Sequence, residues 1–174
     1  MIGTTRLVIA LAIAAIATPI LALWQLIAVR TGWFDERRAP RLWHRLVIRL
    51  LDFRIHVTGA PVTDRPLFIV ANHVSWTDIA VIGSLAEVHF VAKAEMAGWP
   101  VFGRLAKLQR TIFVERERPR KSGEQANEIG GRLADGDPVV LFAEGTTGDG
   151  NLMLPFKTTL FAAARVALET NGGG

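Results

Sequence analysis

The distribution of apolar and polar residues divides the chain into three parts, and the first part is a long apolar run. No charged residue occurs from Leu7 to Val29. At ~1.5 Å per residue a helix of this length covers about 34 Å, slightly more than the ~30 Å hydrocarbon core of a bilayer. Residues 1–30 are therefore predicted to form a transmembrane anchor. A cleaved signal peptide is the competing interpretation, because Ala15 and Ala17 allow cleavage, although its apolar region is normally shorter.

The second part, residues 31–52, carries a basic amphipathic pattern. Between Arg41 and Phe53, leucines together with Trp43 and Val47 recur at helical spacing, while arginines and Asp52 occupy the other face. This pattern is typical of a helix that lies in the membrane interface. A helix packed on a protein core shows the same pattern, so both interpretations are kept.

The third part, residues 53–174, alternates short β-branched or aromatic runs with helical patterns. We expect strands at 54–57, 67–71, 88–92, 111–115 and 139–143, and helices at 78–85, 100–108, 122–133 and 156–169. This alternation predicts an α/β domain whose mostly parallel sheet is flanked by helices. The last helix stops at Asn171 and three glycines, where another strand would be normal. We therefore expect the domain to be incomplete at its C-terminus.

Composition narrows the classes of function. The chain of 174 residues is 50% hydrophobic and 21% charged, which is too apolar for a disordered protein. It has no cysteine, so disulfides, thiolate zinc sites and cysteine nucleophiles are excluded. Its four histidines are scattered, and no metal site is predicted. A net charge of +4 is small for a nucleic-acid binder, but charge alone does not choose between nucleic acid and anionic lipid. For the chain as a whole we expect membrane lipids, and no nucleic acid, as partners.

Basic residues are distributed unevenly about the apolar run. Arg6 precedes it, whereas a group of arginines follows it: Arg30, Arg37, Arg38, Arg41, Arg45 and Arg49. Positive charge accumulates on the cytoplasmic side of membrane helices. We therefore expect a single pass through the inner membrane, with the rest of the chain, including the α/β domain, facing the cytoplasm.

The stretch from Ala71 to Asp78 changes from an apolar strand to a polar cluster just before a helix. Sheets of α/β proteins bind ligands at the carboxyl ends of their strands. The spacing of His73 and Asp78 allows a turn to bring the carboxylate onto the imidazole, which would make a general base. A structural His–Asp pair has the same spacing. Ser75 is interpreted as a helix-capping hydroxyl rather than a nucleophile.

A second polar cluster, from Phe142 to Asn151, also follows an apolar strand. Its glycines, Gly145, Gly148 and Gly150, would let backbone N–H groups approach an anion closely. Glu144 is better suited to organising this loop or to accepting hydrogen bonds from a hydroxyl or a cation. An ordinary glycine-rich turn is the alternative interpretation.

Three motifs in order resemble those of a known family. They are Asn72-His73-Val-Ser-Trp-Thr-Asp78, Thr111-Ile-Phe-Val-Glu-Arg116 and Phe142-Ala-Glu-Gly-Thr146. From about Arg41 to Phe161 the chain resembles the glycerolipid acyltransferases of the 1-acylglycerol-3-phosphate acyltransferase family. That family's motifs are H-x-x-x-x-D, a strand that ends in Arg, and F-x-E-G-T.

The resemblance implies a role for each matching residue. His73 would be the general base and Asp78 its orienting partner. Substrate binding would fall to a further group: Arg116 at a phosphate, Glu144, Gly145 and Thr146 in the acceptor site, and Lys93. The acyl donor would be a thioester on coenzyme A or acyl carrier protein, and no cofactor is expected.

The expected function is acyl transfer to the free hydroxyl of a lysolipid, and 1-acylglycerol-3-phosphate is the expected acceptor. The stretch E-G-T-T-G-D-G-N before L-P-F-K resembles the branch that acylates lyso-ornithine lipid, whose acceptor has no glycerol phosphate. Lyso-ornithine lipid is therefore the alternative acceptor. The alternative from another class is a non-catalytic, membrane-associated lipid-binding domain.

Overall fold

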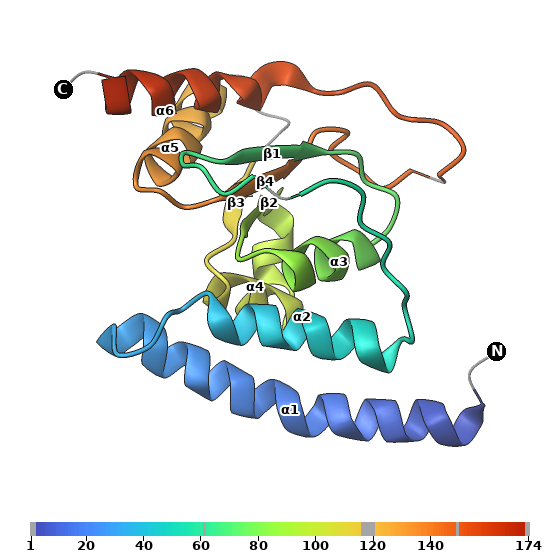
Figure 1. The fold of residues 1–174 in the computed structure, drawn as a ribbon. Coiled ribbons are helices and arrows are strands. Elements are labelled where there is room, and N and C mark those ends of the chain that lie inside the picture. Colours follow the sequence, from blue (N-terminus) through green and yellow to red (C-terminus); the bar gives the residue numbers. More distant parts are fainter. Residues whose placement is uncertain (1–2, 61, 116–120, 149, 173–174) are drawn as a thin grey trace. The chain divides into compact units, whose positions relative to one another are not determined.

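The computed structural model describes residues 3–60, 62–115, 121–148 and 150–172 (Figure 1). The chain divides into two compact units. The first, called the helical unit, comprises Met1–Ala60 and Ile79–Glu87. The second, called the sheet unit, comprises Pro61–Asp78 and Val88–Gly174.

The helical unit begins with α1, Thr4–Thr31, which confirms the helix expected from the apolar run. It ends at Gly32, whose φ of 67° lies in the left-handed region and whose N–H donates to the Ala28 carbonyl. Within the described residues, α1 is the one helix that is long and apolar enough to cross a membrane. The chain therefore has a candidate transmembrane helix at its N-terminal end.

Helix α2, Arg38–Leu50, runs antiparallel beside α1. The indole Nε1 of Trp43 donates to Thr18 Oγ1, near the middle of α1, at 3.0 Å. Arg6, in the first turn of α1, forms a 2.9 Å ion pair with Asp52, just beyond α2. The two helices are thus joined both at mid-length and at one end.

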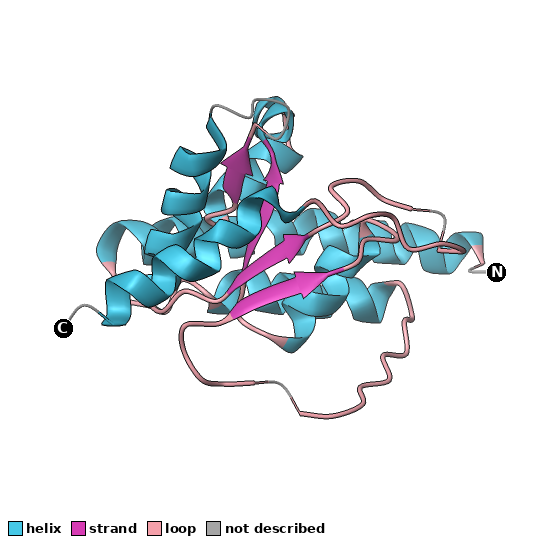
Figure 2. Ribbon diagram, turned by 90° about the horizontal axis from the view of Figure 1, so that it is seen from above, coloured by secondary structure: helices cyan, strands magenta, loops and turns pink. Residues whose placement is uncertain are grey.

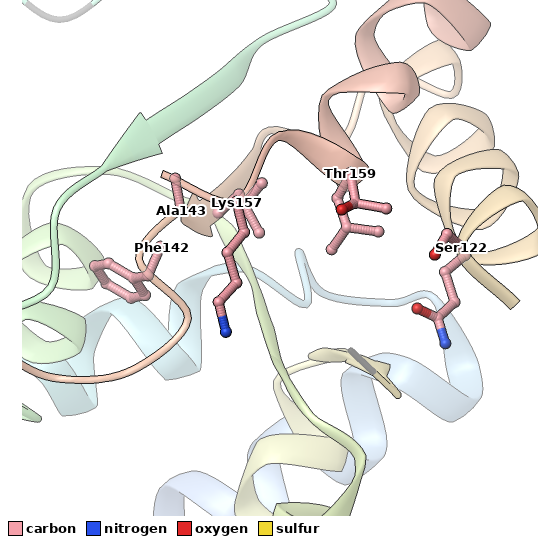
Figure 3. A pocket seen from close by; sticks show the side chains of 8 residues that line it. Ser122, Phe142, Ala143, Lys157 and Thr159 are labelled. Carbon is pink, nitrogen blue, oxygen red and sulfur yellow. The ribbon is translucent and has the colours of Figure 1, made fainter. Parts of the chain in front are cut away.

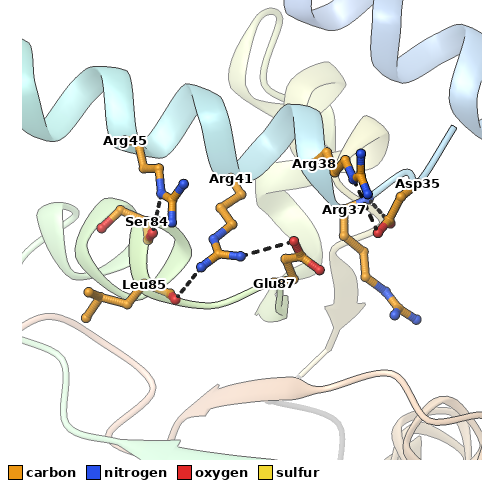
Figure 4. A network of polar contacts seen from close by, with 8 residues as sticks. All are labelled: Asp35, Arg37, Arg38, Arg41, Arg45, Ser84, Leu85 and Glu87. Carbon is orange, nitrogen blue, oxygen red and sulfur yellow. Dashed lines mark hydrogen bonds and ion pairs between the residues drawn. The ribbon is translucent and has the colours of Figure 1, made fainter. Parts of the chain in front are cut away.

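Two arginines of α2 cover the end of α3, Thr77–Leu85 (Figure 4). Arg41 donates to the Leu85 carbonyl at 3.0 Å and to Glu87 at 3.1 Å, and Arg45 donates to the Ser84 carbonyl at 3.1 Å. The last carbonyls of a helix have no partner within the helix, and cations stabilise that end. These two arginines belong to the polar face expected of α2, so their contacts do not decide between a helix packed on a protein core and one in the membrane interface. Both interpretations stay predictions.

The sheet unit contains a four-stranded sheet in which the paired strands are parallel (Figure 2). The strand order is β1-β4-β2-β3, with β1 at Phe68–Ala71, β2 at His89–Lys93, β3 at Ile112–Val114 and β4 at Val139–Phe142. Residues of β4 are buried along its whole length, as expected for a parallel strand covered on both faces. The structure confirms the predicted α/β class.

One expected strand is wrong, and one expected helix has a different start. Residues 54–57 form no strand; they lie in a loop of the helical unit, where Val57 is 55% exposed and no strand is available for pairing. The helix expected at 156–169 begins later than predicted. A 3₁₀ turn, η3 at Thr158–Phe161, precedes α6 at Ala162–Gly172.

Helices cover the sheet and complete its core. Between β2 and β3 lie η1, Ala94–Gly98, and α4, Phe102–Leu108; between β3 and β4 lies α5, Ser122–Ala134. Helices α5 and α6 lie side by side (Figure 1), and Gly130 permits this contact because a Cβ there would be 2.5 Å from Val166 Cγ1. The core joins Ile129 and Leu133 of α5 to buried residues of three strands, among them Val91, Ile112, Val114, Val139 and Leu141.

A buried polar cluster lies at the start of β2. His89 is 3% exposed, its Nδ1 lies 3.1 Å from the Gln109 carbonyl, and its Nε2 lies 3.5 Å from Asp137. Asp137 also accepts a 2.7 Å hydrogen bond from Arg132. Burial lowers the pKa of His89 below its ordinary value of 6.5, assisted by the charges of Arg132 and Arg110 and opposed by the Gln109 carbonyl and Asp137.

This lowered pKa predicts a loss of stability in acid. Below pH 6.5 the unfolded chain binds a proton at His89 that the folded chain binds less readily. The free energy of unfolding should therefore fall as the pH drops below that value. A His89→Asn variant keeps a donor for the Gln109 carbonyl but cannot titrate, so its stability should change less over this range. Urea denaturation at a series of pH values measures the effect, and identical pH profiles for the two proteins would contradict it.

Candidate active site

The site is assembled at the carboxyl ends of β1 and β4, which are neighbours in the sheet. Their register pairs Ala71 with Phe142, so the chain segments that leave the two strands emerge together. His73 follows β1 and Glu144 follows β4, and the backbone N–H of His73 donates to Glu144 Oε2 at 2.9 Å. Parallel pairing therefore joins the two polar clusters that lie far apart in the sequence.

His73 and Asp78 form the pair expected from their spacing. Asp78 Oδ2 lies 2.9 Å from His73 Nδ1 and also accepts the backbone N–H groups of Val74, at 2.7 Å, and Ser75, at 2.9 Å. An ionised carboxylate can only accept hydrogen bonds, so Nδ1 is the donor and carries the proton. The neutral imidazole then has its lone pair on Nε2, which is the atom that can take a proton from a substrate.

The ring of His73 is also held by an aromatic contact. It stacks on Phe142 with ring centroids 4.0 Å apart and an interplanar angle of 17°. The His73 side chain is 14% exposed, so it is sheltered and still accessible. Sequence reasoning missed Phe142 as a site residue, because an aromatic residue at the end of a buried strand has the same pattern as an ordinary core residue.

Glu144 organises the backbone around His73. It is 4% exposed; one carboxylate oxygen accepts the His73 N–H and the other accepts the Leu154 N–H at 3.2 Å. The sequence expectation that Glu144 organises the loop agrees with these contacts. Its additional role in binding the acceptor stays a prediction.

Two glycines of the glycine-rich loop use their backbone N–H groups in hydrogen bonds within the protein. Gly145 has a φ of 76° and donates to the Phe142 carbonyl at 3.1 Å, which forms a tight turn that favours glycine. Gly148 donates to the His73 carbonyl at 2.8 Å. The expectation that these two N–H groups face an anion is therefore wrong in this structure, because each already has a carbonyl partner.

The remaining residues predicted from the sequence have no hydrogen bond to His73 in the part of the chain that the structure describes. Thr146 is exposed beside the turn, and Lys93 is exposed at the carboxyl end of β2. Ser75 Oγ accepts the Thr77 N–H at 3.3 Å, as expected of a capping hydroxyl at the start of α3. Arg116 lies outside the described residues.

Loss of one Glu144 oxygen should loosen this arrangement. A Glu144→Gln variant leaves one of two partly buried N–H groups without an acceptor, which is expected to lower the free energy of unfolding by about 1 kcal/mol. Thermal unfolding measures the effect, with exposed Glu128→Gln on α5 as the control. Equal stability of both variants and the parent chain would contradict this role.

The described residues provide a base and no candidate metal centre. They contain no group of three or more metal-binding side chains. What they offer is a sheltered imidazole, oriented through Nδ1 and open at Nε2, at the edge of a parallel sheet. Such a group can deprotonate a hydroxyl for attack on a carbonyl.

Comparison with known proteins matches the chain to one family model and to several relatives. The family model described as Acyltransferase matches residues 54–171. The chain is 48% identical over 174 residues to the lyso-ornithine lipid O-acyltransferase of Brucella abortus (strain 2308), an alignment that covers 99% of this chain and 64% of that protein. It is 34% identical over 122 residues to the 1-acyl-sn-glycerol-3-phosphate acyltransferase of Neisseria meningitidis serogroup B, covering 69% of this chain and 48% of that protein.

A solved structure has the same fold. The crystal structure of the 1-acyl-sn-glycerophosphate acyltransferase from Thermotoga maritima matches with a TM-score of 0.66 and 24% sequence identity, covering 95% of this chain and 72% of that one. This chain spans less than two thirds of the length of each of the two curated relatives described above.

Proposed function

The chain belongs to the acyltransferase family, and from this premise we propose that it transfers an acyl group from a thioester to the free hydroxyl of a lysolipid. The observation that carries the proposal is the 2.9 Å contact between His73 Nδ1 and Asp78, which leaves Nε2 as the base. Coenzyme A or acyl carrier protein would carry the acyl group.

The proposed reaction needs no acyl-enzyme. His73 Nε2 removes the proton of the acceptor hydroxyl as its oxygen attacks the thioester carbonyl, and Asp78 stabilises the imidazolium that forms. When the carbon–sulfur bond breaks, the imidazolium returns the proton to the leaving thiolate. The products are the acylated lipid and a free thiol.

For the acceptor we propose lyso-ornithine lipid, which revises the expectation of 1-acylglycerol-3-phosphate. The support is the 48% identity to a relative named for lyso-ornithine lipid, against 34% to one named for 1-acyl-sn-glycerol-3-phosphate. Glu144 and Gly148, which belong to the stretch that resembles the lyso-ornithine branch in sequence, are hydrogen-bonded to the backbone of His73. The second candidate acceptor remains 1-acylglycerol-3-phosphate.

A direct comparison of the two acceptors tests this proposal. Acyl transfer is measured with the same donor for the chain as it stands and for the chain extended by the C-terminal part of the Brucella relative. We expect faster transfer to lyso-ornithine lipid, and transfer to 1-acylglycerol-3-phosphate at an equal or higher rate would overturn the acceptor. Lipid binding without transfer in both proteins would favour the non-catalytic lipid-binding domain.

For the membrane, we propose that α1 enters one leaflet from the cytoplasmic side rather than spanning both. The contacts Trp43–Thr18 and Arg6–Asp52 place α2 along α1. If α1 crossed the bilayer, α2 and its arginines would be drawn into the hydrocarbon, at a cost of about 2.5–3.5 kcal/mol for an arginine at the centre. Large exposed apolar side chains on α1, such as Leu11 and Ile16, would instead contact acyl chains from one side.

Cysteine labelling distinguishes the two placements. Gly3→Cys and Gly123→Cys variants in intact cells are treated with an impermeant thiol reagent. With α1 in one leaflet and the sheet unit in the cytoplasm, neither cysteine should react. Reaction at position 3 alone would support the single pass expected from the sequence, and reaction at position 123 would contradict the cytoplasmic location of the sheet unit.

A further inference from the structure

A small pocket lies in the sheet unit beside the carboxyl end of β4 (Figure 3). Its apolar wall is formed by residues 141–143 and Leu160. Four polar side chains line the remainder: Ser122 and Gln125 from the start of α5, and Lys157 and Thr159 from the segment that enters η3. We call it the Lys157 pocket.

The polar groups of the Lys157 pocket are not used by the fold. In the part of the chain that the structure describes, none of the four side chains has a hydrogen-bond or ion-pair partner. Gln125 is 8% exposed as a whole residue, and Lys157 and Thr159 are exposed, so an anion could reach these groups from solvent. Lys157 adds a positive charge that no described carboxylate balances. A cation, an amide and two hydroxyls that face one pocket form a donor set for an anion.

The pocket adjoins the catalytic imidazole through one shared residue. Phe142 forms part of its wall and stacks on the His73 ring with centroids 4.0 Å apart. The backbone at Lys157 is held beside β4, because its N–H donates to the Ala143 carbonyl at 2.8 Å. An anion in the Lys157 pocket would therefore lie beside the residue whose ring contacts the base.

We propose that the Lys157 pocket binds the anionic group of the acyl acceptor, a carboxylate or a phosphate. The inference rests on the proposed function. In lyso-ornithine lipid the carboxylate, and in 1-acylglycerol-3-phosphate the phosphate, lies only a few bonds from the free hydroxyl. The anion can thus occupy the pocket while the hydroxyl meets His73 Nε2. The phosphates of a coenzyme A thioester lie at the far end of the pantetheine arm, and they are the competing source of an anion.

Binding measurements in a His73→Ala background test this assignment without turnover. Titration calorimetry uses soluble short-chain forms of both anionic acceptors, an uncharged monoacylglycerol and coenzyme A. Lys157→Met removes the charge, Lys157→Arg keeps it, and Gln125→Glu adds a carboxylate to the pocket. Lys107→Met, on the exposed side of α4, is the matched control. Circular dichroism establishes that each variant is folded.

We expect Lys157→Met and Gln125→Glu to weaken binding of both anionic acceptors at least about tenfold, because each loses a charge-assisted contact or gains a repulsive one. Lys157→Arg and Lys107→Met should bind as the parent does, and affinity for monoacylglycerol should not change. If Lys157→Met and Gln125→Glu both bind the acceptors with the affinity of the parent, the inference is overturned. It is also overturned if the parent binds no acceptor. Weakened binding of coenzyme A alone would assign the pocket to the donor and overturn the assignment to the acceptor.

Failure of the proposed function would give a different result. It would show as an absence of acyl transfer by the chain with His73 intact. Transfer by that chain, together with unchanged acceptor affinity in the Lys157→Met and Gln125→Glu variants, would overturn the pocket assignment alone.

Discussion

Replacement of His73 by alanine is expected to lower the rate of acyl transfer by about 10²–10⁴-fold, because it removes the group that accepts the hydroxyl proton. The fold should survive. The contacts of His73 with Glu144 and Gly148 are made by its backbone N–H and carbonyl, which alanine retains. Initial rates with saturating donor and acceptor measure the effect.

A second histidine provides the control for this experiment. His56 is exposed in a loop of the helical unit, and His56→Ala should transfer acyl groups at the rate of the unchanged chain. Activity of His73→Ala within about threefold of the parent would exclude His73 as the general base. Circular dichroism of both variants shows whether any loss of rate comes from unfolding.

Replacement of Asp78 by asparagine should be nearly as severe, with an expected loss of about 10²–10⁴-fold in kcat. A single oxygen, Oδ2, accepts hydrogen bonds from the His73 ring and from the N–H groups of Val74 and Ser75. An amide can present one oxygen to these donors, but it has no negative charge to stabilise the imidazolium. The imidazole is then a weaker base even where its orientation is kept.

Separate measurement of kcat and KM for Asp78→Asn distinguishes stabilisation of the imidazolium from binding of the substrate. Asp78→Asn should change the KM for the acceptor little, because Asp78 acts through His73 rather than on the substrate. Asp64→Asn, in an exposed part of the sheet unit, serves as the control. A large increase in KM with an unchanged kcat would show that Asp78 binds substrate instead of orienting the base.

Local patterns in the sequence were enough to predict most of the helices and strands and the contact between His73 and Asp78. Apolar runs bounded by glycine, proline or charged residues predicted four of the strands, and the length of the run from Leu7 to Val29 predicted α1. These predictions succeed because the pattern of apolar and polar residues within a segment reflects how that segment is buried. The spacing of His73 and Asp78 was enough to predict their contact, because only a turn and the first residue of α3 lie between them.

Only the tertiary structure decided which distant segments meet. The strand order β1-β4-β2-β3 places β4 beside β1, and this pairing brings Glu144 and Phe142 to His73. Nothing in the local pattern specifies such a partner, because any parallel strand of similar length offers the same hydrogen-bonding groups. The same reason explains the loop at 54–57, where a strand-like run has no neighbour with which to pair. Tertiary packing also gave Lys157 and Gln125 a common pocket and placed two arginines of α2 at the end of α3.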